Sequence, residues 1–159
     1  GHKIDECLIY LIGLFEELSL SEMKSACQRL TMPDRLLDRA LQAHRETDPL
    51  LAKLARSDIS SSMVYNILRP LAHETLVYAL STTHSQQAKK SISLYLTHLK
   101  DIKLSIGGDD LISMGVEPGP IYRELLDATR DALLNGELEQ GEVYERAYAR
   151  RFLDLHKPD

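Results

Sequence analysis

The sequence predicts an all-α fold, a bundle or array of about eight to nine short helices. Apolar residues recur at spacings of three and four along almost the whole chain, which is the period of one helical face. Serine, aspartate and proline start signals, and glycine stop signals, separate these periodic segments. The 159 residues are 43% hydrophobic with a mean hydropathy of -0.24, so the chain is long and apolar enough to bury a core.

The first hundred residues contain most of the expected helices. Ile4 to Leu18 step by four and three, and Ser19 or Ser21 can cap the helix that follows. Pro33 opens a third helix, and Asp48 followed by Pro49 reads as a separate start signal. A polar stretch at 81–84 can cap the last helix of this part. The expected helices span 4–18, 23–30, 33–41, 49–55, 63–68, 70–80 and 88–99.

Residues 101–106 alternate briefly and are expected to be an extended linker between two helical subdomains, a body at 1–104 and a tail at 105–159. The charge also changes here. Residues 1–100 hold 12 Lys and Arg against 11 Asp and Glu, a net charge of +1, whereas residues 101–159 hold 7 against 13, a net charge of -6. If the chain touches RNA, its first part is therefore the better candidate.

The segment 108–122 is dense in backbone signals. Gly115 can take the left-handed conformation that ends a helix, and Pro118 and Pro120 exclude helix for the residues before them. Pro120 suits the first position of the next helix, where a missing N–H costs nothing. We expect a helix over 109–114, a rigid turn and a long helix from Pro120, forming a helix-turn-helix tail.

The two longer helices of the tail are predicted from their rows of apolar residues. The first carries Ile121, Leu125, Ala128 and Ala132, and it is expected to stop at 135–136. The last is expected to bury one row and to pair Glu142 with Arg146 on its surface. That buried row is Tyr144, Ala147, Tyr148 and Phe152.

The cysteines and the N-terminal residues indicate the cellular compartment and the extent of the chain. Cys7 and Cys27 are read as reduced, small, core-facing residues of a cytoplasmic protein, and no apolar run is long enough to span a bilayer. The chain begins Gly-His without an initiator Met, which suggests a cloning remnant, so a piece of a longer protein is expected.

No pattern indicates catalysis or a metal site. The run 107–110 is Gly-Gly-Asp-Asp, but adjacent carboxylates on a helix point about 100° apart and cannot share metal ions as alternate strand residues do. Capping of the helix start is the better interpretation of both aspartates. The histidines form no pair at ligand spacing, and Cys-x-x-Cys is absent from the sequence, so neither catalytic nor metal-binding residues are assigned.

The segment 108–137 carries a recognisable pattern: G-x-D-L, a later Gly, P-G-P, then a helix with Leu-Leu and a closing N-G-E. It resembles the C-terminal body and tail of bacterial tRNA nucleotidyltransferases, the CCA-adding and A-adding enzymes and their poly(A) polymerase relatives. Segments 64–71 and 91–96 resemble the same family, and the likeness covers roughly residues 56–140. The residues of the pattern are Gly108, Asp110, Leu111, Gly115, Pro118, Gly119, Pro120, Leu125, Leu126, Asn135, Gly136 and Glu137.

The resemblance implies a parent enzyme that adds CCA, or only the terminal A, to tRNA 3′ ends with Mg²⁺ in a catalytic head that this chain lacks. It implies no cofactor here, and tRNA as the partner, held at its elbow. An alternative is a helical protein–protein interaction or dimerisation module that does not contact RNA, which the net charge of -5 favours. The chain could also form a homodimer.

Basic side chains and one turn are the candidate RNA contacts, although each is more often an ordinary surface feature. The Pro118–Pro120 turn could be purely structural, or it could present the amides of the next helix to an RNA backbone. The nearby acidic residues disfavour the second reading. The candidates are Arg56, Arg69, Lys89, Lys90 and Arg123, with Ile121 and Tyr122 as amide donors.

Overall fold

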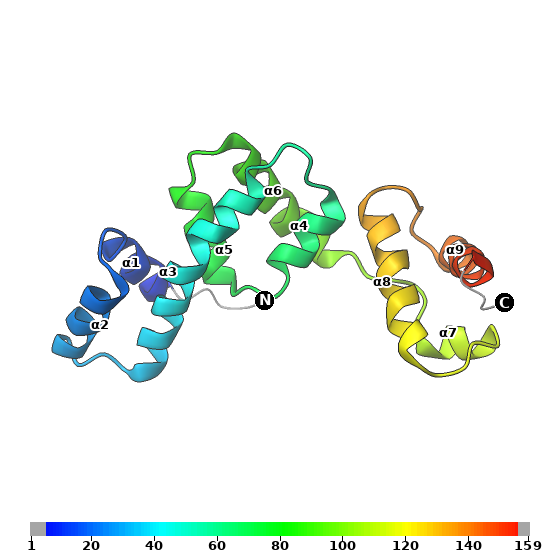
Figure 1. Ribbon diagram of the computed structural model, residues 1–159, viewed down its shortest axis with the longest axis horizontal. Helices are drawn as coiled ribbons and strands as arrows, with labels where there is room; N and C mark the ends of the chain where they lie inside the picture. Colours follow the sequence, from blue (N-terminus) through cyan, green and yellow to red (C-terminus); the bar gives the residue numbers. More distant parts are fainter. Residues whose placement is uncertain (1–5, 156–159) are drawn as a thin grey trace.

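A computed structural model describes residues 6–155 and confirms the all-α prediction, since every regular element in this range is helical. The molecule is elongated, with α1–α3 at one end and α7–α9 at the other (Figure 1). None of the helices in 6–155 is long and apolar enough to cross a bilayer. The elements are α1 (Glu6–Leu14), α2 (Leu20–Arg29), α3 (Asp34–Leu54), α4 (Ser61–Leu68), α5 (His73–Thr82), α6 (Gln86–Thr97), the short 3-10 helix η1 (Leu99–Asp101), α7 (Gly108–Ser113), α8 (Pro120–Leu134) and α9 (Glu142–Leu155).

Serine caps start three of the helices. Ser19 and Glu22 form a capping box on α2, in which each backbone N–H donates to the other side chain, at 2.9 and 3.3 Å. Ser60 accepts the Met63 N–H at the start of α4. The cap of α6 is Ser85, one residue after the predicted stretch 81–84. The earlier hydroxyls are engaged elsewhere, because Ser81 and Thr82 both donate back to the Tyr78 carbonyl.

The predicted break before Pro49 is wrong: α3 runs continuously through it. A proline inside a helix costs on the order of 3 kcal/mol, because it removes a backbone hydrogen bond and crowds the preceding turn. Leu50 and Leu54 lie beyond it and are both almost fully buried. Burying each contributes about 1.5–3 kcal/mol, which is enough to keep the last turns of α3 helical.

Two other helix limits differ from the predictions. α1 ends at Leu14, and a turn closed by the Leu18 N–H on the Phe15 carbonyl (3.0 Å) replaces its expected last turn. The predicted start at Ile4 lies outside the described residues. α5 begins at His73 instead of 70, because residues 69–71 form the turn that closes α4, with the Leu71 N–H on the Leu68 carbonyl (3.1 Å).

The buried apolar residues form three clusters. The first joins α1, α2 and the start of α3, and Tyr78 of α5 reaches into it. The second, called the middle cluster, joins the end of α3 with α4, α5, α6 and η1, and includes Leu134 from the end of α8. The third, called the tail cluster, lies among the tail helices and contains Ile106, Leu111, Leu125 and Ala149. The tail thus has a core of its own, while the boundary at 104/105 stays a prediction.

The segment between α7 and α8 follows the predicted pattern. Gly115 has a φ of +81° directly after the end of α7, and Gly136 has a φ of +74° after the end of α8. Pro120 is the first residue of α8, as expected. Local backbone chemistry therefore determined these three positions.

The prediction that both cysteines are buried is wrong, because Cys7 is exposed while Cys27 is buried.

The predicted apolar row of α9 is only partly buried. Tyr144 and Ala147 are exposed, whereas Tyr148 is half-buried and Phe152 packs against the tail cluster. The fully buried residues of α9 are Glu145 and Ala149. The reason is that Glu145 has backbone partners inside the fold, so the row centres on an acidic side chain that hydrophobic periodicity ignores.

Candidate functional site

A cleft with a volume of about 550 Å³ opens between the α4–α5 turn and the end of α6. This volume lies in the range of small-molecule binding clefts, roughly 300–1,000 Å³. Its walls combine positive, apolar and aromatic side chains with a single carboxylate. The lining residues are Arg69, Leu71, His73, Leu76, Tyr95, Lys100 and Asp101.

The ends of three helices bring these side chains together. Arg69 caps the C-terminus of α4, and His73 begins α5 after the turn at Pro70. Tyr95 lies in the last turns of α6, and the following tight helix η1 carries Lys100 and Asp101. Buried Leu99 holds η1 against the middle cluster, so the two charged residues beside it are directed outward.

The Tyr95 ring lines the cleft and packs against the ring of Tyr65. The Tyr65 and Tyr95 rings are tilted by 55° with centroids 6.1 Å apart, and the Arg69 guanidinium lies 5.8 Å from the Tyr65 centroid. A guanidinium at this distance is attracted to the ring face. Burial, and then the neighbouring Tyr65 hydroxyl, raise the pKa of Tyr95. Its hydroxyl therefore stays protonated at neutral pH and can donate a hydrogen bond.

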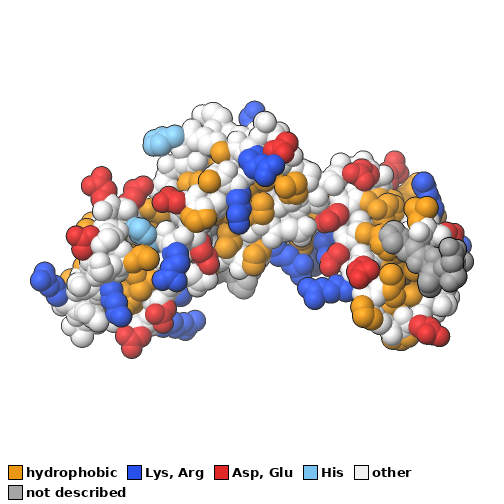
Figure 2. All heavy atoms as spheres, in the orientation of Figure 1, with side chains coloured by type: hydrophobic (Ala, Val, Ile, Leu, Met, Phe, Trp, Pro, Cys, Tyr) orange, Lys and Arg blue, Asp and Glu red, His pale blue; other side chains and the backbone are white. Residues whose placement is uncertain are grey.

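Of the predicted basic residues, only Arg69 lies in the cleft. Arg56 is bound by Asp58 through two contacts, at 3.0 and 2.6 Å, and this pairing lowers the pKa of Asp58. Lys89 is half-buried and Lys90 exposed near the opposite end of α6 from Tyr95. Figure 2 shows Lys and Arg side chains on the indented side of the molecule, with Asp and Glu along the adjoining tail.

The two predicted amide donors lie at the start of α8. The Tyr122 N–H already donates to the Gly119 carbonyl at 3.1 Å, and the Tyr122 hydroxyl donates to the Val116 carbonyl at 2.8 Å. These bonds close the turn on itself, which leaves Ile121 as the amide of the pair that a ligand could use. The neighbouring Arg123 is 90% exposed and lies 3.7 Å from Asp127. RNA contact by these residues stays a prediction.

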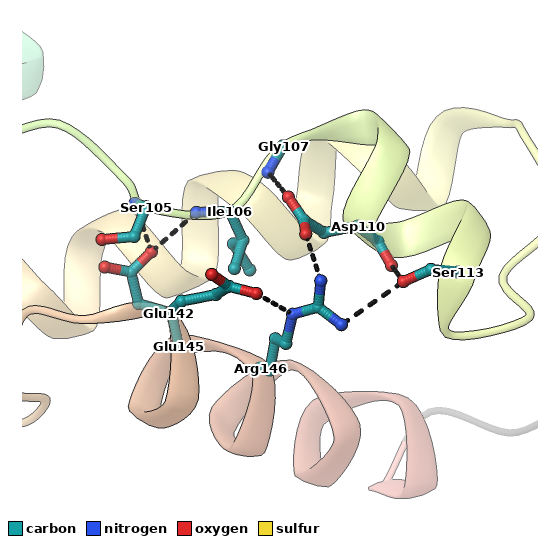
Figure 3. Close-up of polar contacts among 8 residues, drawn as sticks. All are labelled: Ser105, Ile106, Gly107, Asp110, Ser113, Glu142, Glu145 and Arg146. Carbon is teal, nitrogen blue, oxygen red and sulfur yellow. Dashed lines mark hydrogen bonds and ion pairs between the residues drawn. The ribbon is translucent and has the colours of Figure 1, made fainter.

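Three acidic residues of the tail, Asp110, Glu142 and Glu145, take part in polar contacts that join α9 to α7 and to the linker (Figure 3). Asp110 accepts the Gly107 N–H at 2.8 Å, which caps α7, and it pairs with Arg146. Arg146 also lies 3.0 Å from Glu142 and 3.4 Å from the Ser113 hydroxyl. The Gly107 N–H first, and then Arg146, hold the pKa of Asp110 below its usual value. The predicted capping role of Asp110 is therefore confirmed.

Glu145 is the most buried of these three acidic side chains, with no exposed surface. One of its carboxylate oxygens accepts the N–H groups of Ser105 (2.7 Å) and Ile106 (3.1 Å), and the other accepts that of Gly141 (3.2 Å). It joins the linker to the start of α9. Nowhere in residues 6–155 do three His, Cys, Asp or Glu side chains gather in a way that could hold a metal ion.

Sequence reasoning missed His73, Lys100 and Asp101, because isolated charged residues at helix ends carry no signal of their own. They meet Arg69 only through the packing of α4 and α5 on α6. Glu145 was missed for the same reason, since its partners at 105 and 106 are about 40 residues away in sequence.

The fold is an all-helical array, and its cleft is lined by two cations, one carboxylate, a histidine, two leucines and a tyrosine. The chain is similar to the A-adding tRNA nucleotidyltransferase of Geobacter sulfurreducens, with 34% identity over 142 residues. The match covers 86% of this chain and 16% of that enzyme. The resemblance to tRNA nucleotidyltransferases that the sequence motifs indicate is confirmed. No family model matches the chain, and no solved structure matches it.

Proposed function

We propose that this chain is the tRNA-binding region of an enzyme that adds CCA, or the terminal A, to tRNA 3′ ends. The observation that carries the proposal is the similarity to an A-adding tRNA nucleotidyltransferase over 86% of the chain. That relative favours addition of A. Nucleotidyl transfer and its Mg²⁺ ions belong, in this proposal, to a separate head domain, and the described helices hold the tRNA elbow at a fixed distance from it.

The cleft supports this role through its charge. Arg69 and Lys100 are exposed cations at its mouth, placed to neutralise phosphates of an RNA backbone. Folded RNA is recognised mostly by shape and by backbone contacts, so a rigid helical array with a few well-placed cations suits the task. The overall negative charge does not oppose it, since the excess of acidic residues lies in 101–159.

Fluorescence titration of labelled tRNA with this chain, at about 50 and about 200 mM salt, tests the proposal. If two to three phosphates are neutralised, affinity should fall by about tenfold or more between the two salts. A polymerisation assay with tRNA, CTP and ATP should show no incorporation by this chain alone. Absence of tRNA binding at both salts, or incorporation of nucleotides, would contradict the proposal.

A second candidate is a helical interaction or homodimerisation module. It is favoured by large apolar side chains that remain exposed on α1, where Tyr10 and Leu14 are 76% and 74% exposed. This candidate predicts a molar mass that rises with protein concentration in sedimentation, together with no tRNA binding. The salt-dependent titration therefore separates the two candidates.

A further inference from the structure

We infer that the cleft between the α4–α5 turn and η1 holds a single unstacked nucleotide of the bound RNA, with its phosphate at the cationic mouth and its base against the apolar floor. The inference rests on the proposed function, and it assigns to the cleft a chemistry beyond backbone contact.

The lining residues of the cleft fall into an exposed group and a buried group. Arg69 and Lys100 are exposed at the mouth, whereas Leu76 and Tyr95 are buried, with 2% and 8% of their surface exposed. Paired RNA presents phosphates to a surface but keeps its bases stacked inside the helix. It could therefore touch the mouth and not the floor. An unstacked nucleotide can reach both, and aromatic side chains commonly receive such bases.

Asp101 is the feature that backbone binding leaves unexplained. A carboxylate beside two cations weakens the attraction for phosphate, and it lies close enough to Tyr95 to help raise the pKa of that phenol. A nucleotide carries hydrogen-bond donors that a carboxylate can accept, namely base amino groups and the ribose 2′-hydroxyl. Asp101 therefore suits the donor side of a nucleotide, while Arg69 and Lys100 suit its phosphate.

Calorimetric titration with small probes tests this directly: AMP, CMP, UMP, 2′-deoxy-AMP and ribose 5-phosphate. AMP and CMP should bind at least about fivefold more tightly than ribose 5-phosphate, since stacking one base contributes about 1–3 kcal/mol. Weaker binding of UMP than of CMP assigns Asp101 to a base amino group, and weaker binding of 2′-deoxy-AMP than of AMP assigns it to the 2′-hydroxyl. Ribose 5-phosphate binding as tightly as AMP would overturn the inference.

Variants locate the site. R69Q, K100Q and D101N change exposed side chains, so their folding can be verified by circular dichroism, and K24Q, which changes an exposed lysine on α2, is the matched control. Each of the three should weaken AMP binding about tenfold, and K24Q should leave it unchanged. D101N should spare ribose 5-phosphate if Asp101 accepts from a base amino group, and should weaken it as well if Asp101 accepts from the 2′-hydroxyl. Equal loss in K24Q, or no loss in R69Q, would contradict the assignment.

The tRNA titration separates this inference from the proposed function. If tRNA binds but AMP does not bind at millimolar concentration and R69Q has no effect on tRNA, the single-nucleotide site is wrong and the proposed function stands. If AMP binds in the cleft but tRNA does not bind, the tRNA role is wrong, and so is the assignment of the ligand to a nucleotide of that RNA. Competition between AMP and tRNA supports both.

Discussion

The buried carboxylate of Glu145 accepts the backbone N–H of Ser105 at 2.7 Å, which joins the last helix to the linker that precedes the tail. The same side chain accepts two further amides, so three backbone groups depend on one residue. Hydrogen bonds to a charged acceptor are stronger than neutral ones. The attachment of α9 therefore depends on a polar contact as well as on its apolar row.

Replacing Glu145 should release α9. E145A leaves buried amides without an acceptor, and we expect a loss of about 3 kcal/mol in the free energy of unfolding. Urea unfolding measures this, and hydrogen exchange should show the Ser105 and Ile106 amides losing protection first. E142A is the matched control, because Glu142 is exposed and its ion pair should contribute less than about 1 kcal/mol. Equal effects of the two substitutions would contradict the assignment.

Asp110 should give the tail an acid-sensitive attachment. Its pKa is lowered in the folded state, so its stabilising contribution is present above the unfolded value and is lost as pH falls through the folded one. Thermal unfolding followed between neutral pH and pH values below the ordinary carboxyl pKa of about 3.9 measures the loss. D110N should flatten that part of the pH profile, and D109N, which alters an exposed neighbour, should not.

Tyr78 should make the folded state less stable at high pH. Burial first, and then Glu16 and Asp48, raise its pKa to about 12. Because the unfolded value is about 10, the stabilisation is present below that pH and is lost as pH rises toward 12. The loss should be on the order of 1–2 kcal/mol once partial solvent access is allowed for. In alkaline unfolding, Y78F should abolish this loss of stability, whereas Y10F, which changes an exposed ring, should leave it unchanged.

Replacing Pro49 should increase the stability of the fold. P49A restores a backbone N–H inside α3 and removes the crowding of the proline ring, and the more flexible unfolded chain cancels about 0.4–1 kcal/mol of the gain. We expect a net increase of about 2 kcal/mol in the free energy of unfolding, measured by chemical denaturation. An unchanged or lower stability would show that the helix has adapted its packing to the proline.

Arg69 and Arg56 should differ in RNA binding although both were predicted to contact it. Arg56 is neutralised by Asp58, while Arg69 faces the cleft. R69Q should lower the slope of log affinity against log salt by about 0.7–0.9, the contribution of one phosphate contact. R56Q should leave the slope unchanged. The test compares tRNA titrations of both variants at several salt concentrations.

The parts of this fold that the sequence predicted are those determined locally. Gly115, Gly136 and Pro120 act through their own backbone chemistry, so the joint between α7 and α8 and the end of α8 could be read directly. Helix existence followed from periodicity in the same way. Proline at 49 misled the prediction because burial of the residues after it outweighs the local signal.

The cleft and the attachment of α9 could not be predicted, because both depend on packing between distant segments. A glutamate on a helix is solvent-facing by default, and only the amides of the linker make a buried Glu145 favourable. Similarly, Lys100 and Asp101 acquire a common neighbourhood with Arg69 only when α4 packs on α6.

The fifteen-residue helix α8 contributes Leu134 to the middle cluster and Leu125 to the tail cluster. At its far end the Asn135 side chain accepts the Ser62 N–H of α4 at 3.0 Å. A helix of this length is about 22 Å long and resists bending. The helix is therefore held by packing in both clusters, so the tail cannot rotate about the linker alone: displacing it requires α8 to bend or one of these contacts to open.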